Sequence, residues 1–514
     1  MNSNWISRQR SCISWFAVLL LGVLMHSSDL LAQPAANGKQ PPAQKSSPKA
    51  VAAYADAANF QNQKLYDIAI EEWERFLGKF ADDPLASKAQ QYLGVCHLQQ
   101  KQYAKASIAF EVVLKKHPDF ANLEETYLNL AWCHYSQALV EKKAAARAKL
   151  FQQAAARFAE QVKKFPAGKL ADQALFFRGE SLHSIAEKEQ AATSFAALVK
   201  SFPKSALRPD ALYSLGVARE DLKQFAEAGK AYDLFLAEYQ EHNLFTEVSM
   251  RKAETVLQTG DFQQAAKRFG EVAAVEKFVS ADYALYRQAF CLTKLDQLAA
   301  AGKIYVQLVE SFPKSKFSTD AMLSAGRCFY RSQQFKDAQL WFEKLLQTEG
   351  EAAYEASHWI ARIHLRSNAP AAALKLVEKM LPTAAQSRYY VNLKMDQADA
   401  FYEFPEKRNA ALAAYLDIAR EHADTDLAPQ ALYNGAFVAL DIKQYPAALE
   451  HAAAFQQKFP ENALLPDVNY VIAESQLQLQ KLDEAEKQYR GLIEKFGQHR
   501  EVRVWKLRLA VVLY

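Results

Sequence analysis

Four cysteines stand in short motifs of the kind that bind metal ions or form disulfides. Cys96 and Cys133 are each followed directly by a histidine, in GVCH and AWCH, and lie 37 residues apart. Cys291 and Cys328 occur in AFCL and GRCF and are separated by the same interval. Thiolate and imidazole are common zinc ligands, and paired thiols of an exported protein can oxidise. Whether these residues can meet depends on the elements that carry them.

The other residues with catalytic potential form no recognisable constellation. The sequence has no HExxH, no GxxxxGK[ST] loop and no GxSxG turn, the signatures of zinc proteases, P-loop enzymes and α/β-hydrolases. His358 and His364 are six residues apart, so they lie on different faces of one helix. We therefore predict no catalytic residues, no metal site and no cofactor, and the chain is not expected to be an enzyme.

A fixed period organises the chain instead. The stretches SFPKSALRPDALYSLG at 201–216 and SFPKSKFSTDAMLSAG at 311–326 are near copies, 110 residues apart, which is three steps of about 37. Most steps carry an alanine followed four places later by an aromatic residue, as in Ala191 and Phe195, and the later steps are less regular, as in Ala373 and Val377. A small residue, here Gly179, stands twelve places before the alanine, and a proline, here Pro203, often stands twelve places after it. Such a period of 20–50 residues indicates a stack of small structural repeats.

Elementary packing explains the pattern as a helical hairpin. Small residues on helix A and helix B let the two backbones approach, and the aromatic side chain fills the space beside them. The proline then ends helix B. One hairpin leaves an apolar face uncovered, and stacking on its neighbours buries that face.

The pattern Gly-x11-Ala-x3-aromatic-x7-Pro resembles the tetratricopeptide repeat (TPR), and positions 94, 106, 110 and 118 match it in full. The resemblance implies an all-α, right-handed superhelix over residues 51–514, with about twelve hairpins and a final helix, irregular near 141–150 and 381–410. The 37-residue repeat with FP-x-S junctions is similar to exported bacterial proteins. That subgroup includes the periplasmic TolA-binding proteins and the TPR lipoprotein of the outer-membrane barrel-assembly machine.

The period also predicts a structural role for the four cysteines. All four stand two residues after the small residue of helix A, a slot that Ser181, Ala218 and Ser475 fill elsewhere. Equivalent positions on neighbouring repeats are about 10 Å apart, beyond the ~7 Å limit for a disulfide. We therefore predict buried free thiols.

In TPR proteins, helix A side chains one, four and five residues after the small position line the concave face, and the resemblance implies partner contacts there. The acidic residues of this face are Glu180, Glu220, Asp221 and Glu254. The candidate partner-binding residues are Trp132, Tyr135, Phe176, Tyr213, Tyr286, Phe290, Arg327, Tyr330, Arg331, Arg362 and Arg366.

The four arginines allow two interpretations. Arg327 and Arg331, like Arg362 and Arg366, are four residues apart and share a helix face. Like charges at this spacing repel weakly, so an acidic partner or another anion would stabilise them. Alternatively, they pair with Glu355, Asp320 and neighbouring carboxylates.

The N-terminus predicts export. Arg8 and Arg10 precede the 13-residue apolar run ISWFAVLLLGVLM, followed by small residues, as in a secretory signal peptide over 1–32 cleaved between Ala32 and Ala35. The run is too short to span a bilayer comfortably, although an N-terminal anchor helix is the alternative. Residues 33–50 are rich in Pro, Ala and Gln and predict a disordered linker. We expect a periplasmic or envelope-associated protein without a membrane span after cleavage.

The totals point to protein partners. The formal net charge of +4 over 514 residues, with no basic block, argues against nucleic acid as a partner. We predict a scaffold for envelope proteins or peptides, acting in envelope assembly, maintenance or division. The alternative is a component of polysaccharide secretion or wall remodelling, with a catalytic module beyond residue 514. Ala510 occupies the small position of a last helix A, and KLRLAVVLY is a poor cap, so we expect either that a dimer mate or partner covers it or that the chain is the front part of a longer protein.

Overall fold

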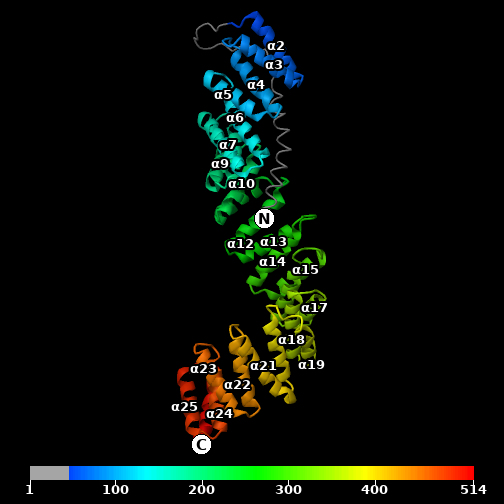
Figure 1. Ribbon diagram of the computed structural model, residues 1–514, viewed down its shortest axis with the longest axis vertical. Coiled ribbons are helices and arrows are strands. Elements are labelled where there is room, and N and C mark those ends of the chain that lie inside the picture. Colours follow the sequence, from blue (N-terminus) through cyan, green and yellow to red (C-terminus); the bar gives the residue numbers. More distant parts are fainter. Residues whose placement is uncertain (1–44) are drawn as a thin grey trace. The chain divides into compact units, whose positions relative to one another are not determined.

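The computed structural model describes residues 45–514 (Figure 1). Over this range it contains 25 α-helices, α2 to α26, one short 3-10 helix and no strand, which confirms the predicted all-α fold. The predicted signal peptide and residues 33–44 of the predicted linker lie outside the described residues. The first helix begins at Pro48 and not at residue 51, and the Ser47 side chain caps it by accepting from the Ala50 N–H.

The helices group into two compact units, one up to Gly168 and one from Lys169 onward. The first contains α2 (Pro48–Asn62), α3 (Tyr66–Lys79), α4 (Ala86–Gln99), α5 (Tyr103–Lys116), α6 (Leu123–Val140) and α7 (Ala144–Lys164). The insertion near 141–150 lengthens α6 and α7 to 18 and 21 residues, against 14 in α4 and α5.

The second unit continues the same alternation of helix A and helix B. Its helices are α8 (Ala171–Ser184), α9 (Lys188–Ser201), α10 (Arg208–Asp221), α11 (Phe225–Glu238), α12 (Phe245–Gln258), α13 (Phe262–Ala273), α14 (Ala281–Lys294), α15 (Leu298–Ser311), α16 (Ser318–Arg331), α17 (Phe335–Leu345), α18 (Glu351–Arg366), α19 (Pro370–Met380), α20 (Tyr390–Tyr402), η2 (Pro405–Lys407), α21 (Arg408–Glu421), α22 (Ala428–Asp441), α23 (Tyr445–Lys458), α24 (Leu465–Gln478), α25 (Leu482–Lys495) and α26 (Val502–Leu513).

In the regular hairpins the small and aromatic residues that define the period meet. Ala191 and Phe195 on α9 are fully buried. A Cβ built on Gly179 of α8 would lie 2.5 Å from Cε1 of Phe195, so this ring rests on the bare backbone of helix A. The same close approach recurs at Gly94, Gly216 and Gly326. The hairpin packing predicted from the sequence is therefore confirmed.

The turn from helix A to helix B is equally regular. In ten hairpins the residue five places before the helix B alanine has a positive φ, as at Lys64, Ala186 and Gly260. Nine of these ten residues are not glycine, although a side chain in this region costs about 1 kcal/mol or more. The two exceptions are the hairpin of α6 and α7, where the insertion near 141–150 replaces the ordinary turn, and the hairpin with α21, where η2 replaces it.

The repeated SFPKS sequence makes the turn from helix B to the next helix A. The Ser205 hydroxyl accepts from the backbone N–H of Leu207 and donates to Asp172 at the start of the preceding helix A, at 2.6 Å. Ser315 makes the same bonds with Phe317 and Asp282. The near copies in the sequence are thus junctions that anchor one hairpin on the previous one.

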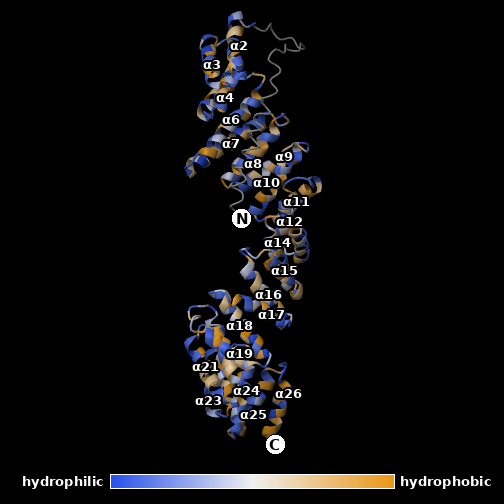
Figure 2. Cartoon of the chain, turned by 90° about the vertical axis from the view of Figure 1, so that its right-hand side faces the viewer, coloured by the Kyte–Doolittle hydropathy of each residue, from blue (hydrophilic) through white to orange (hydrophobic). Residues whose placement is uncertain are grey.

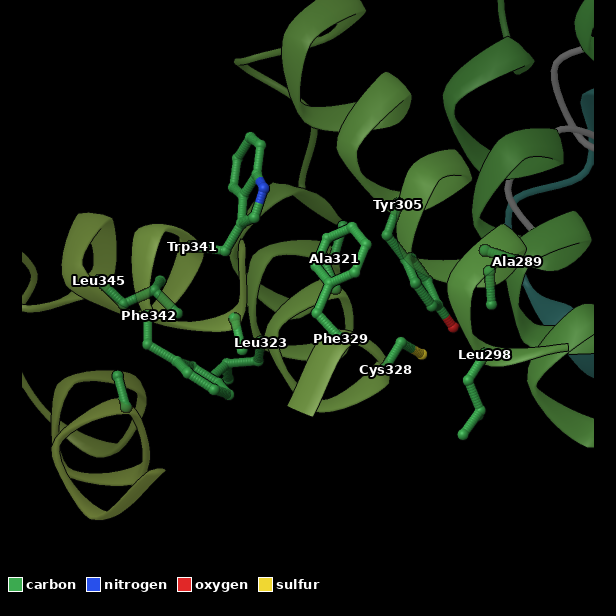
Figure 3. Packing of buried hydrophobic residues seen from close by; sticks show 14 of the residues in the cluster. Ala289, Leu298, Tyr305, Ala321, Leu323, Cys328, Phe329, Trp341, Phe342 and Leu345 are labelled. Carbon is green, nitrogen blue, oxygen red and sulfur yellow. The ribbon is translucent and has the colours of Figure 1, made fainter. Parts of the chain in front are cut away.

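Neighbouring hairpins share one core. Figure 3 shows Tyr305 on α15, Phe329 on α16 and Phe342 on α17 among buried residues of three successive helices. Hydrophobic and hydrophilic residues intermix along the labelled helices, as amphipathic packing requires (Figure 2). Consecutive A helices also contact each other, as α18 does α20 and α22 does α24. Successive A helices of the second unit therefore lie next to each other.

The predicted cysteine role is confirmed for the four cysteines of the repeats. Cys96, Cys133, Cys291 and Cys328 are all buried free thiols. Burial raises the pKa of each, to about 12 at Cys96 and about 11 at Cys291. A raised pKa keeps a thiol protonated and poorly reactive.

Candidate partner-binding site

The predicted aromatic anchors near α6 are part of the core. Trp132 and Tyr135 are only 7% and 6% exposed. The Trp132 ring meets the edges of Tyr135 and Phe158, with centroids 5.4 and 6.1 Å apart. These contacts hold the α6–α7 hairpin together, so the prediction that the two rings face a partner needs correction.

Three further aromatic residues belong to another register than the one predicted. Phe176, Tyr213 and Tyr286 stand three residues before the small residue of helix A, and not after it. This position faces the aromatic residue of the hairpin's own helix B. Phe176 therefore packs 5.8 Å from Phe195, and Tyr286 packs 5.8 Å from Tyr305. Phe176 and Tyr213 are buried, and Tyr286 is half-buried.

Phe290 and Tyr330 are half-buried and already contacted by neighbouring side chains. Arg287 and Lys294 both lie 5.4 Å from the centre of the Phe290 ring. Tyr330 lies 5.0 Å from Trp359, between centroids. Both residues lie on A helices as predicted, but neither presents a bare ring face.

The predicted acidic residues connect A helices to one another. Glu220 on α10 pairs with Arg251 on α12 at 2.8 Å and accepts from the Tyr232 hydroxyl at 2.9 Å. Glu254 on α12 accepts two bonds of 2.9 Å from Arg287 on α14. We call these pairs between successive A helices the inner ion-pair ladder. The ladder pairs Glu220 and Glu254 with arginines of the protein itself, although the sequence had placed both carboxylates on the face expected to bind a partner.

Asp221 and Glu180 differ from these two. The Asp221 carboxylate lies 3.1 Å from Nε2 of His183 and 3.5 Å from Nζ of Lys188, and both of these residues belong to the preceding repeat. Glu180 accepts only a long bond, 3.3 Å, from the Ser214 hydroxyl. Burial without a cation raises the pKa of Glu180 to about 7.

Carboxylates pair with three of the four predicted arginines, and two of these pairs belong to the ladder. Arg327 pairs with Glu355 on α18 at 3.1 Å, which is the partner that the second interpretation named. Arg331 pairs with Asp296 at 3.0 Å, and Arg362 pairs with Asp396 and Asp399 on α20. Because these guanidinium groups already have carboxylates, a four-arginine anion site is not what the structure presents.

Arg366 is the arginine that remains. It is exposed, and among residues 45–514 it forms no ion pair. Its guanidinium lies 5.5 Å from the centre of the Phe335 ring, a cation–π contact that leaves the N–H groups available.

Arg366 borders a pocket of about 240 Å³ that is lined by residues of α18, α20 and α21 and by Glu403. The lining residues of α18 and α20 and Glu403 stand one, four or five places after the small residues Ala361 and Ala398, which is the register implied by the TPR resemblance. The pocket is lined by Arg362, Leu365, Arg366, Asp399, Tyr402, Glu403 and Tyr415.

Part of the pocket lining is hydrogen-bonded within itself, and its charges are matched. Asp399 accepts from Arg362 and from the Tyr415 hydroxyl. Burial and the Asp399 charge raise the pKa of Tyr415, which keeps the phenol protonated as a donor. Behind them Asp396 lies 2.6 Å from His358, and burial raises the pKa of Asp396 to about 6. These residues position the pocket.

The rim holds the groups that can recognise a ligand. Glu403 is exposed and, within the described range, has no ion-pair partner. It stands 37 residues after Arg366, so the two occupy the same register on successive repeats without pairing. Tyr402 also lines the pocket and is half-buried, with the Arg408 guanidinium 5.2 Å from the centre of its ring. The rim therefore offers a cation, an anion and an aromatic ring.

Sequence reasoning named Arg362 and Arg366 and missed Asp399, Tyr402, Glu403 and Tyr415. The signal was present, because adding 37 to Arg362 and Arg366 gives Asp399 and Glu403. Asp399 and Glu403 lie in the irregular segment 381–410, where the repeat pattern is difficult to follow, and this obscures the 37-residue step.

No group of three or more His, Cys, Asp or Glu side chains could hold a metal ion in the described part of the chain. Among its helices, none has the length and apolar character needed to span a membrane.

Comparison with known proteins identifies the repeat. Family models described as tetratricopeptide repeat match residues 54–119, 185–243 and 283–315, so TPR repeats occur in both units. Among solved structures, a chain in the structure of Naa15/Naa10 bound to HypK-THB aligns at 14% identity, over 90% of this chain and 80% of that chain, with a TM-score of 0.39. No curated protein sequence matches.

Proposed function

We propose that this TPR-containing chain is an exported, non-enzymatic scaffold that binds peptide or protein partners in the cell envelope. Its binding role rests on one observation: the rim of the α18–α20 pocket keeps Arg366 and Glu403 unpaired while the surrounding charges are matched. TPR repeats and an extended inner side of A helices support a scaffold for protein partners.

The pocket favours an extended peptide over a compact small molecule. Its volume of about 240 Å³ is below the range of about 300–1,000 Å³ of small-molecule sites and suits one or two side chains. Arg366 can donate to a carboxylate, Glu403 can accept from a cation or amide, and the Tyr402 ring offers a flat surface in the same pocket. We therefore propose a segment in which an acidic and a basic residue lie close together.

A peptide library displayed on phage and selected against residues 33–514 tests this proposal. We expect selected peptides to carry both charges and to bind Arg366→Glu at least tenfold more weakly, because a hydrogen bond to a charged group contributes about 1.5–3 kcal/mol. Arg75→Glu is the matched control, an exposed arginine on α3 in the other unit. Peptides that bind Arg366→Glu as tightly as the unchanged protein would contradict the pocket as the binding site.

Export rests on the sequence of residues 1–32 and needs a separate test. Residues 1–50 fused to alkaline phosphatase, which is active only outside the reducing cytoplasm, should give an active enzyme in a bacterial host. Replacing Leu19, Leu20 and Leu21 by Asp interrupts the apolar run and should abolish the activity. An inactive unmodified fusion would remove the envelope from the proposal and leave the scaffold.

A further inference from the structure

A second exposed cation stands in the register of Arg366, two repeats earlier. Lys294 on α14 and Arg366 on α18 each lie five places after the small residue of helix A, and both side chains are exposed. The Lys294 ammonium lies 5.4 Å from the centre of the Phe290 ring. The Arg366 guanidinium lies 5.5 Å from the centre of the Phe335 ring. Neither cation forms an ion pair within residues 45–514, so both charges are available to a ligand.

Contacts between the repeats connect these two cations. Asp296, two residues after Lys294, pairs with Arg331 on α16 at 3.0 Å. Arg331 stands in the same register as Lys294, 37 residues later. Phe335, four residues after Arg331, lies against Arg366. Lys294, Arg331 and Arg366 therefore follow one another on the A helices α14, α16 and α18, and we call them the cation row.

The middle position of the cation row carries no net charge. The pair of Arg331 and Asp296 lies at the surface, where 55% and 77% of the two side chains are exposed. A carboxylate that approached Arg331 would be repelled by Asp296. The cation row therefore attracts carboxylates at Lys294 and at Arg366, with a neutral step between them.

The cation row ends at the pocket, where the sign of the charge changes. Glu403 takes the next position of the same register, 37 residues after Arg366, and lines the same pocket. In the repeat after that, Asp441 is already paired with Arg408 at 2.9 Å. Along this register from α14 to α22, the unpaired charges are therefore two cations followed by one anion.

The repeat geometry converts this order of charges into a spacing along a peptide. Packed helices lie about 8–10 Å apart, and an extended chain advances about 3.3 Å per residue. One repeat therefore corresponds to about three residues of an extended partner. Charges that match Lys294 and Arg366 stand about six residues apart, and a charge that matches Glu403 stands about three residues beyond.

We propose that the partner is an extended segment with two acidic residues about six positions apart and a basic residue about three positions beyond the second. The first acidic residue meets Lys294, the second meets Arg366, and the basic residue meets Glu403. This inference rests on the proposed function and extends its site from the pocket to α14. A nucleic acid or another polyanion fits less well, because Asp296 and Glu403 interrupt the positive charge.

A synthetic peptide with this pattern tests the inference. The peptide DSSSSSDLSK has the three charges at the required spacings and a leucine that can contact Leu365 and Tyr402 in the pocket. It is blocked at both ends, labelled with a neutral dye, titrated against residues 33–514 at low salt and followed by anisotropy. We expect Lys294→Glu to weaken binding about threefold to tenfold, because single ion pairs at exposed sites are weak. Lys303→Glu is the matched control and should leave the affinity unchanged, since Lys303 is an exposed lysine on α15 of the same hairpin.

A charge exchange between protein and peptide shows whether the two groups meet. Replacing the first aspartate of the peptide with lysine should weaken binding to the unchanged protein and restore binding to Lys294→Glu. The same peptide should show no recovery with Lys303→Glu. A general change in the charge of the protein would affect both variants alike, so only direct contact with Lys294 predicts this difference.

The outcomes separate this inference from the proposed function. If Arg366→Glu weakens binding of the peptide and Lys294→Glu does not, the pocket stands and the extension to α14 is wrong. No binding at millimolar concentration also overturns the inference, and the phage-selected peptides then decide the proposed function alone. An oligonucleotide that displaces the peptide and binds Lys294→Glu more weakly would assign the cation row to a polyanion and overturn the inference as well.

Discussion

The contact between Gly179 and Phe195 makes an unusual prediction for a glycine inside a helix. Replacing such a glycine with alanine ordinarily stabilises a helix by about 0.8–1.0 kcal/mol. Here the new Cβ would lie 2.5, 2.7 and 2.8 Å from three atoms of the Phe195 ring. Carbon atoms prefer about 3.5–4.0 Å, so the ring would have to move by about 1 Å inside a fully buried site.

Overpacking of this kind costs about 1–3 kcal/mol. The net effect of Gly179→Ala is therefore a loss of about 0–2 kcal/mol. Gly491, inside α25, provides the matched control because nothing lies within 4 Å of its built Cβ. The helix-propensity gain is common to both substitutions, so the free energies of unfolding of the two variants should differ by the overpacking cost, about 1–3 kcal/mol.

Urea unfolding followed by circular dichroism at 222 nm gives the midpoints of the unchanged protein and both variants. Repeat proteins can lose their repeats in stages, so hydrogen exchange of α8 and α9 is measured alongside. We expect faster exchange there in Gly179→Ala and a higher midpoint in Gly491→Ala. If Gly179→Ala stabilises the protein as much as Gly491→Ala does, the ring does not rest on the glycine and the hairpin packing is misassigned.

Three further predictions concern the turns, the ladder and pH. Ala186→Gly should raise stability by about 0.5–1 kcal/mol in urea unfolding, because Ala186 has a φ of 64° that glycine adopts without strain; no gain would contradict this reading. Arg287→Ala should cost about 1–3 kcal/mol by leaving the Glu254 carboxylate unpaired, and adding Glu254→Gln should recover part of it. The folded-state pKa of Glu180 is about 7, above its ordinary value, so folding favours the protonated form. Stability should therefore fall as pH rises from about 4.5 to about 7, and Glu180→Gln should remove this dependence in urea midpoints measured across that range.

Much of the fold was predictable because each hairpin repeats one local contact. Ala191 and Phe195 specify the packing of α8 on α9, and a step of 37 residues transfers the same argument along the chain. The start of the helix capped by Ser47 was less predictable. Its first residues, Pro48, Lys49 and Ala50, resemble in composition the Pro- and Ala-rich segment that precedes them. The lengthened α6 and α7 show that an insertion can extend two helices without breaking the contact between them.

The site was less predictable, because a sequence states which residues are charged and not which charges meet. Glu254 and Arg287 are 33 residues apart, while Arg362 and Asp399 are 37 apart, and both pairs join successive A helices. Side-chain length thus allows more than one spacing. A concave-face register alone therefore selects ladder residues and ligand residues together, and only the structure separates Arg366 from Arg362.

The matched charges of the pocket restrict what it can recognise. Arg362 and Arg366 on α18 are balanced by Asp399 on α20 and by Glu403 directly after it, so the lining has no net charge. A simple anion attracted to Arg366 would be opposed by Glu403, and a simple cation would be opposed by Arg366. A peptide that carries both charges meets a complementary group on each side and replaces no existing ion pair. The pocket should therefore discriminate by the order and spacing of charges along a peptide and bind polyanions weakly.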